Sequence, residues 1–245
     1  EVSIAGLGRA FDGFRIGFVA DIHWPRNITR DFLRDAAATL VAGKPDLILL
    51  GGDLTDLKRH PQPLVIGDAF DGFRAPYGTF GVLGNHDFGF GSGPRHGRVA
   101  EVRERLAETP VQLIDRSHRN ILRDRDVLLV GGVGDYWYDR VRPELAFAGG
   151  PDGPRILLAH NPDQAVDETW SLPVGLTLSG HTHGGEVRLP FVGPIVLPIR
   201  HEWLDMGLKS GPNGPIYVTR GLGSPRGARF RCRPELTLIT LRSSV

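Results

Sequence analysis

The sequence predicts an α/β fold in which two mixed β-sheets pack face to face and are flanked by helices. Its first half alternates short apolar runs with a helix-length amphipathic segment, and its second half contains closely spaced apolar runs separated by turns. Alternating strands and helices favour parallel strands with helices packed on them. Because no change of composition marks a linker, we expect a single domain over residues 1–245.

The first half of the chain contains three expected strands and the helices between them. Residues 29–42 carry apolar side chains at helical spacing, and Gly43 and Pro45 close this segment. A proline-punctuated stretch after residue 56 is expected to be a second helical segment. The expected strands of this half cover residues 14–20, 46–50 and 78–83.

The second half begins with an expected helix at residues 99–106, whose alternating Arg and Glu residues suit a solvated face. Strands then follow at short intervals, and two sheets packed face to face accommodate all of them. The expected strands of this half cover residues 111–114, 120–122, 127–130, 156–159, 176–178, 186–189, 216–219 and 236–241.

The composition excludes several classes of protein. The chain of 245 residues is 40% hydrophobic and 23% charged with a formal net charge of +1, which is ordinary for a soluble domain and gives no specific indication of nucleic-acid binding. A single cysteine, Cys232, excludes an intrachain disulfide and a zinc-thiolate site. No apolar run reaches the roughly 20 residues that span a bilayer, and no signal peptide is visible.

The localisation stays open between the cytoplasm and a membrane surface. The chain begins at Glu1 and its one methionine is Met206. We therefore expect the natural translation start to be missing, together with any anchor or signal that preceded it. The sequence does not indicate an oligomeric state.

The stretch 179–185 carries two histidines, His181 and His183, directly after the apolar run 174–178 and directly before two glycines. Side chains two residues apart in an extended segment point to the same side, so both imidazoles can reach one cavity. Glycines beside them let the backbone bend tightly. Two satisfied histidines at a strand end are the alternative reading of this stretch.

The same kind of side chain follows each of five expected strands. The residues at these points are Asp21 and His23, Asp53, Asn85 and His86, His160, and His181 and His183. Carboxylate, imidazole and amide ligands without thiolate suit Mn, Fe or Zn. One ion would be over-supplied by this many ligands, whereas two ions about 3.5–4 Å apart and bridged by one carboxylate use them all.

The order of these motifs resembles that of the calcineurin-like metallophosphoesterases. The matching motifs are Asp-x-His from Asp21, Gly-Asp-x-x-Asp from Gly52, Gly-Asn-His-Asp from Gly84, the lone His160, and Gly-His-x-His from Gly180. The resemblance implies the αββα sandwich of that family. The tail of the chain is also similar to a small bacterial branch that includes UDP-diacylglucosamine pyrophosphatases and membrane-associated phosphodiesterases.

The resemblance implies a role for each motif residue. Asp21, His23 and His183 would hold the first metal and Asn85, His160 and His181 the second, with Asp53 as the bridge. The nucleophile would be a metal-bound hydroxide, His86 the acid that protonates the leaving oxygen, and Asp56 the carboxylate that orients His86. Manganese is the expected metal, with Fe, Zn, Mg and Ni as alternatives.

Other polar residues allow two interpretations. Asp56 and Asp87 could each cap a turn or pair with an arginine instead of serving the site. Trp24 could line the substrate mouth or simply pack. Arg226 and Arg229 could bind phosphate oxygens or remain solvated in an arginine-rich protein.

The sequence therefore predicts a two-metal hydrolase of phosphodiester or pyrophosphate bonds. A lipid-linked nucleotide pyrophosphate is one candidate substrate, which would allow peripheral membrane association, while cyclic nucleotides and nucleic-acid ends stay open. Loops 88–97 and 191–197 are candidates for an apolar lid. A phosphomonoesterase and a non-catalytic binding module on the same fold are the alternatives, and the intact ligand set favours the enzyme.

Overall fold

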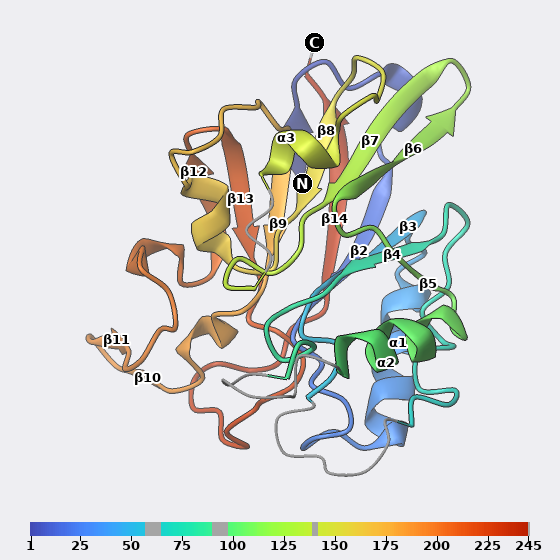
Figure 1. Cartoon of the computed structure of the whole chain (residues 1–245). Coiled ribbons are helices and arrows are strands. Elements are labelled where there is room, and N and C mark those ends of the chain that lie inside the picture. The colour runs from blue at the N-terminus through green and yellow to red at the C-terminus, as the bar shows by residue number, and fades with distance from the viewer. Residues whose placement is uncertain (57–64, 90–97, 139–141, 245) are drawn as a thin grey trace.

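Two six-stranded sheets and a separate two-stranded hairpin make up the β-structure of the computed structural model. The structure describes residues 1–244 except 57–64, 90–97 and 139–141. Figure 1 shows the sheets packed against each other, with helices α1 and α2 beside one sheet and α3 beside the other. The predicted α/β architecture of two mixed sheets is confirmed.

The first sheet has the strand order β1-β14-β2-β3-β4-β5. Strands β2 to β5 run parallel to one another, and β14 runs antiparallel to β2. The carboxyl ends of β2, β3 and β4 therefore meet along one edge of this sheet. The bounds are β1 Val2–Ile4, β2 Arg15–Val19, β3 Leu47–Gly51, β4 Thr79–Val82, β5 Val111–Leu113 and β14 Thr237–Ser243.

The second sheet has the strand order β12-β13-β9-β8-β7-β6. Strands β13, β9, β8 and β7 are parallel, and the outer strands β12 and β6 pair antiparallel with their neighbours. The bounds are β6 Ser117–Arg123, β7 Asp126–Gly132, β8 Arg155–Leu158, β9 Leu176–Ser179, β12 Gly207–Gly211 and β13 Gly214–Val218.

Alternation along each central strand divides its apolar side chains between two cores. In β3, Leu47 and Leu49 lie in the core that both sheets share, whereas Ile48 and Leu50 lie in a core with the helices. This is why the central strands read as continuous apolar runs. Strands of both sheets contribute to the shared core, through residues such as Phe18, Leu128 and Leu158.

Within the described residues, three α-helices cover the outer faces. Helix α1, Arg30–Ala42, begins where the side chain of Thr29 accepts a hydrogen bond from the Phe32 amide, and it ends at Gly43. Its apolar face packs in the same core as that of α2, Arg98–Ala107. The short helix α3, Pro143–Ala146, packs on the outer side of the second sheet.

The structure differs from the sequence prediction between the second and third strands. Residues 65–76 form turns rather than the expected helical segment, and residues 57–64 lie outside the described residues. The side chain of Thr79 donates to the Phe73 carbonyl, and Phe70 and Phe73 are buried, so tertiary packing replaces a helical ladder here. Strand β1 and helix α3 were not expected because each is short, and β12 was not expected because glycine and polar residues make up most of it.

In the part of the chain that the structure describes, no helix combines the length and apolar character that crossing a bilayer requires.

Leu128 offers a test of the shared core. It is 0% exposed in β7 between the two sheets, so Leu128→Ala should lower the free energy of unfolding by about 2–5 kcal/mol in urea denaturation. Leu122, in the neighbouring strand β6, is 68% exposed, and Leu122→Ala should change that free energy by less than about 0.5 kcal/mol. Equal effects of the two substitutions would contradict the assigned core.

Candidate metal centre

The predicted ligands come together where strands of both sheets end. Asp21 and His23 follow β2, Asp53 follows β3, and Asn85 follows β4 of the first sheet. His160 follows β8, and His181 and His183 follow β9 of the second sheet. Main-chain hydrogen bonds from Asp21 to Gly52 and from Gly180 to His160 tie the loops to one another within each sheet. All of these predicted ligands are buried.

The backbone at the site is strained. Five of the predicted ligands have φ angles between 49° and 69°, a left-handed region that residues with a Cβ rarely occupy. They are Asp21, His23, Asp53, His181 and His183. Such conformations cost on the order of 1–3 kcal/mol each and persist only where the surroundings impose them. The strain indicates that side-chain placement, rather than backbone preference, determines these loops.

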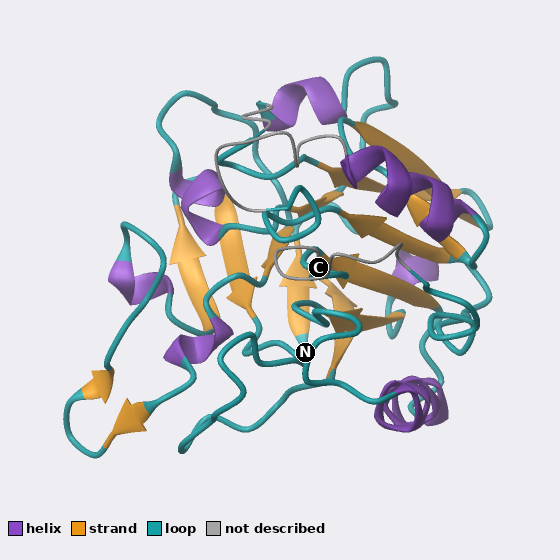
Figure 2. Cartoon of the chain, turned by 60° about the horizontal axis from the view of Figure 1, so that its bottom comes forward, coloured by secondary structure: helices purple, strands orange, loops and turns teal. Residues whose placement is uncertain are grey.

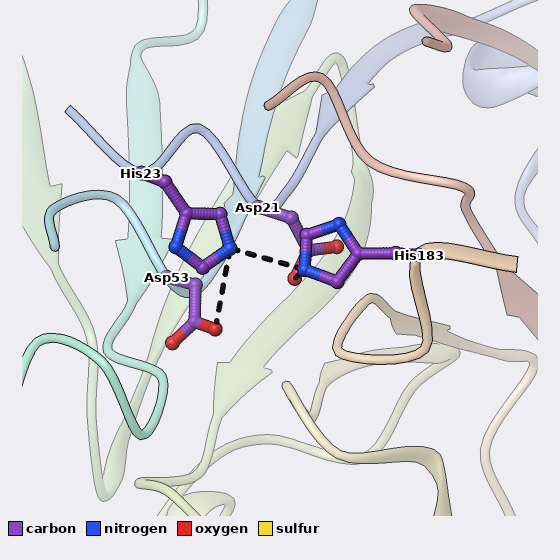
Figure 3. Close-up of side chains that lie close together, drawn as sticks. All are labelled: Asp21, His23, Asp53 and His183. Carbon is purple, nitrogen blue, oxygen red and sulfur yellow. Dashed lines mark hydrogen bonds and ion pairs between the residues drawn. The ribbon is translucent and has the colours of Figure 1, made fainter. Parts of the chain in front are cut away.

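One cluster consists of Asp21, His23, Asp53 and His183 (Figure 3). The Nε2 atoms of His23 and His183 are 3.0 Å apart. Nε2 of His183 lies 3.6 Å from Oδ1 of Asp21, and Nε2 of His23 lies 3.7 Å from Oδ2 of Asp53. One potential ligand atom from each of the four residues falls within 4.8 Å of the others, which is compact enough for a single ion.

A second cluster consists of Asp53, His160 and His181. His160 Nδ1 is hydrogen-bonded to the Gly51 carbonyl at 2.8 Å, which turns Nε2 toward Oδ2 of Asp53 at 3.3 Å. His181 Nε2 is hydrogen-bonded to the Pro198 carbonyl at 3.1 Å. Such carbonyl partners fix the ring orientation of metal-binding histidines. The amide oxygen of Asn85 is buried and has no hydrogen-bond partner in the described structure, as expected of a ligand.

Asp53 belongs to both clusters through the same atom. Its Oδ2 faces His23 and His160, while its Oδ1 accepts a hydrogen bond from the His86 amide at 2.8 Å. A Cβ on Gly84 would collide with Asp53 and His160, so glycine lets the third loop approach this carboxylate. The carboxylate is held in the geometry of a bridge between two sites.

The electrostatics of the clusters fit divalent cations. Burial lowers the pKa values of His23 and His181 to about 3, so both rings are neutral at pH 7. Burial raises the pKa of Asp21 to about 7, so a positive charge is needed to keep this carboxylate ionised. For Asp53, burial alone would raise the pKa. The neighbouring His160 and His86 outweigh burial, so the pKa of Asp53 lies well below its usual value. The neutral rings of His23 and His181 are suitable ligands for Mn, Fe or Zn. Burial opposes a charged His160, but the carboxylates of Asp53 and Asp21 outweigh it and raise the pKa of His160 to about 10, so a cation bound there would displace its proton.

His86 stands beside these clusters as part of an Arg26–Asp56–His86 chain. Its Nδ1 lies 3.3 Å from Oδ1 of Asp56, and Oδ2 of Asp56 accepts a hydrogen bond from Arg26 at 2.9 Å. Burial opposes a charged His86, but the carboxylates of Asp53 and Asp56 outweigh it and raise its pKa. Asp56 thus pairs with Arg26 and also lies beside His86, and its role in orienting His86 stays a prediction.

Asp87 agrees with the alternative interpretation, in which it caps a turn. Its carboxylate accepts hydrogen bonds from the amides of Leu54, Thr55 and Gly84 and from the hydroxyl of Thr55. It therefore fastens the Asp53 loop to the Asn85 loop. Asn161 and Asp163 likewise shape turns, since Asn161 accepts from the Asp163 amide and Asp163 accepts from the amides of Arg200 and His201.

A cleft of about 350 Å³ opens over the clusters. Polar side chains, among them Asp53 and His86, and apolar side chains both line it. The lining residues include Arg26, Trp137, Glu186, Val196, Pro198 and Arg226. Arg226 lies on the rim, with Nε 3.6 Å from Oε2 of Glu186 and 59% of its side chain exposed.

The structure does not place the other two predicted substrate residues in this cleft. Trp24 is 6% exposed, packs in the helix-side core and donates its indole hydrogen to the Val65 carbonyl. The guanidinium of Arg229 is hydrogen-bonded to the carbonyls of Arg220, Gly221 and Gly223. Trp24 is therefore used for packing, whereas Arg229 binds backbone carbonyls and also lies 3.4 Å from Nδ1 of His183 through its Nη2. That either side chain binds substrate stays a prediction.

Three residues of the site were missed from the sequence. Arg26 and Trp137 line the cleft, and the Trp137 ring meets the edge of His181 at 4.8 Å between centroids. Asp135 is fully buried, and burial raises its pKa to about 6. Asp135 follows β7 as the recognised ligands follow their strands, and this position was the signal that could have found it.

Comparison with known proteins agrees with this geometry. The model of the family described as calcineurin-like phosphoesterase matches residues 14–185. Phosphodiesterase YaeI of Escherichia coli is 34% identical over 231 residues, covering 93% of this chain and 82% of that protein. The metallophosphoesterase YkuE of Bacillus subtilis is 34% identical, covering 97% of this chain and 82% of its own. UDP-2,3-diacylglucosamine pyrophosphatase LpxG of Chlamydia trachomatis is 27% identical, covering 93% and 83%.

Asp53→Asn tests the shared carboxylate. Because Oδ2 of Asp53 faces both clusters, this variant should lose metal from both sites together, and metal analysis after dialysis should give less than about half of the wild-type content. Asp124→Asn, in the exposed turn between β6 and β7, is the matched control and should keep the wild-type content. Full metal content in Asp53→Asn would contradict the bridging role.

Proposed function

The chain belongs to the calcineurin-like phosphoesterase family, and we propose that it hydrolyses phosphodiester or pyrophosphate bonds at a centre of two divalent metal ions. The observation that carries this proposal is Oδ2 of Asp53, which faces a histidine of each cluster at 3.7 Å and 3.3 Å. Asp21, His23 and His183 would complete one site, and Asn85, His160 and His181 the other. Two ions held in this way supply an activated water nucleophile and neutralise charge on the phosphoryl group.

His86 is suited to act as the general acid. His86 lines the cleft. Because its pKa is raised, its ring stays protonated to a higher pH than a free imidazole does. Asp56 fixes the ring through Nδ1, which leaves Nε2 to donate a proton to the leaving oxygen. Asp56 itself stays ionised. Its contact with His86 and the hydrogen bond that it accepts from Arg26 together lower the pKa of Asp56.

The cleft favours a substrate with two substituents on phosphorus. Arg26 and Arg226 lie outside the metal ligands, where they can neutralise a second phosphoryl group, and Trp137, Val196 and Pro198 offer apolar surface to a leaving group. Relatives of this chain bear the names phosphodiesterase and UDP-2,3-diacylglucosamine pyrophosphatase. We therefore rank a phosphomonoesterase and a non-catalytic binding module below a diesterase or pyrophosphatase.

Manganese is the proposed metal, because carboxylate, amide and imidazole ligands without thiolate suit it, with Fe, Zn, Mg and Ni as alternatives. A lipid-linked nucleotide pyrophosphate is the proposed substrate class, and the protein would then act in the cytoplasm or as a peripheral membrane protein. The apolar wall of the cleft supports a substrate with an apolar part.

Hydrolysis of a chromogenic phosphodiester beside the corresponding monoester tests the proposed reaction. Metal-free protein should be inactive, added manganese should restore turnover with the diester preferred, and Asp53→Asn protein serves as the blank. Preference for the monoester would favour the phosphomonoesterase. The absence of turnover with every divalent metal, despite bound metal, would favour a binding module.

His86→Ala tests the general acid. Turnover of the diester should fall by roughly 10²- to 10⁴-fold, whereas metal content should stay near that of the wild type because His86 lies outside both ligand sets. His201→Ala, which removes an exposed histidine paired with Asp163, is the control and should retain turnover. Wild-type turnover in His86→Ala would remove His86 from the mechanism.

Two arginine variants separate substrate binding from packing. Arg226→Ala should raise the KM for the diester by roughly two- to tenfold, because this guanidinium lies on the cleft rim. Arg229→Ala should instead lower the free energy of unfolding by about 1–3 kcal/mol, because it leaves backbone carbonyls without their donor. Arg125→Ala, in the exposed β6–β7 turn, should change neither quantity. An unchanged KM in Arg226→Ala would exclude it from substrate binding.

A further inference from the structure

A short hairpin stands away from the sandwich beside the cleft. Strands β10, Arg188–Leu189, and β11, Gly193–Pro194, pair antiparallel with each other and belong to neither large sheet. Figures 1 and 2 show the hairpin projecting beyond the body of the molecule. We call residues 189–195 the hairpin tip.

The hairpin tip exposes large apolar side chains. Phe191 is fully exposed, and Val192, Ile195 and Leu189 are 73%, 57% and 42% exposed. Exposed apolar residues are common singly, but a contiguous group on a projecting turn marks an interaction site. These side chains are too exposed to stabilise the fold by burial.

The backbone of the tip also disfavours the residue that occupies it. Phe191 has φ 65°, in the left-handed region where a bulky side chain is unfavourable and glycine or asparagine is common. The turn therefore combines backbone strain with a fully exposed aromatic ring. Neither feature stabilises the fold, which makes the tip a candidate interaction site.

The base of the hairpin is fastened to the rest of the protein. Arg188 donates to the Gly184 carbonyl and to the Asp205 carboxylate, each at 2.9 Å. Val187 forms a bridge with Phe230, and the Ile195 amide donates to the Val187 carbonyl at 3.2 Å. These contacts hold the tip at a fixed distance from the metal centre.

Amphipathic rings and charges of both signs lie near the tip. Arg231 directly follows Phe230 at the hairpin base, is exposed, and has no acidic partner in the described part of the chain. Phe230 is 51% exposed, and Trp203 lines a groove with Val192 and Ile195 that also contains Glu202, Asp205 and Lys209. Aromatic side chains behind an apolar tip match the boundary of a lipid surface, and the exposed Arg231 can contact an anionic headgroup.

The hairpin connects directly to the cleft. The segment that returns from its tip supplies Val196 and Pro198 to the cleft wall, and the Pro198 carbonyl accepts the hydrogen bond of His181. The hairpin tip and part of the cleft wall therefore belong to one continuous segment.

We propose that the hairpin tip inserts into the surface of a lipid bilayer with anionic headgroups and brings the cleft to a phosphoryl group held there. The part of this inference that concerns the substrate rests on the proposed function, whereas the docking itself does not. A narrow convex tip fits between lipids, while a second copy of the chain would need a broad, flat partner face.

Co-sedimentation with vesicles tests the docking. Wild-type protein with bound metal should sediment with phosphatidylglycerol vesicles, more weakly with phosphatidylcholine vesicles, and less as salt is raised. The double variant Phe191→Ser with Val192→Ser should bind these vesicles at least about tenfold more weakly than the wild type does. The matched control, Leu122→Ser with Leu145→Ser, removes two exposed leucines elsewhere and should bind as wild type does.

Wild-type binding by the tip variant, or no sedimentation of the wild type with either vesicle, would overturn the proposal. Equal binding to both vesicles would overturn the anionic preference, and a dimer lost in the tip variant would assign the tip to a second copy. Turnover of the soluble diester distinguishes the two proposals, because the tip variant should retain it in full. Tip-dependent sedimentation without any turnover would sustain the docking and overturn the hydrolysis.

Discussion

The site depends on one buried carboxylate oxygen, Oδ2 of Asp53, that faces histidines from both sheets. His23 reaches it from the end of β2, and His160 reaches it from the end of β8 in the opposite sheet. Packing the two sheets face to face is what brings these strand ends within ligand distance. The positive φ angles at Asp21, Asp53 and His183 show that this convergence strains the loops, which the shared core must offset.

Much of the fold and nearly all of the ligand set could be predicted from the sequence. Residues such as Ile48 and Leu50 lie on strands buried on both faces, so their apolar runs stand out from the polar residues that follow. Because parallel strands deliver their carboxyl ends to one edge, Asp21 and Asp53, which follow neighbouring strands of the first sheet, could be grouped without a structure. His160 follows a strand of the second sheet, so its approach depends on how the two sheets pack. Their metal-binding roles remain predictions, supported by the distances between them.

Other features could not be predicted because they depend on tertiary contacts. Trp24 and Arg229 have the residue types of a binding site, but the first fills a core gap and the second satisfies carbonyls that only the folded loops bring together. Arg26 is held beside the site by its hydrogen bond to Asp56, which lies 30 residues away in the sequence. The exposure of Phe191 likewise depends on how the hairpin stands on the fold, since the sequence indicated only an apolar loop at 191–197.

Anomalous X-ray diffraction from crystals grown with manganese tests the central claim most directly. The account predicts two separate manganese peaks, one among Asp21, His23 and His183 and the other among Asn85, His160 and His181, with the Asp53 carboxylate in contact with both. A single peak, or two peaks of which only one touches Asp53, would contradict the account of Asp53 as the carboxylate that joins the two halves of the site.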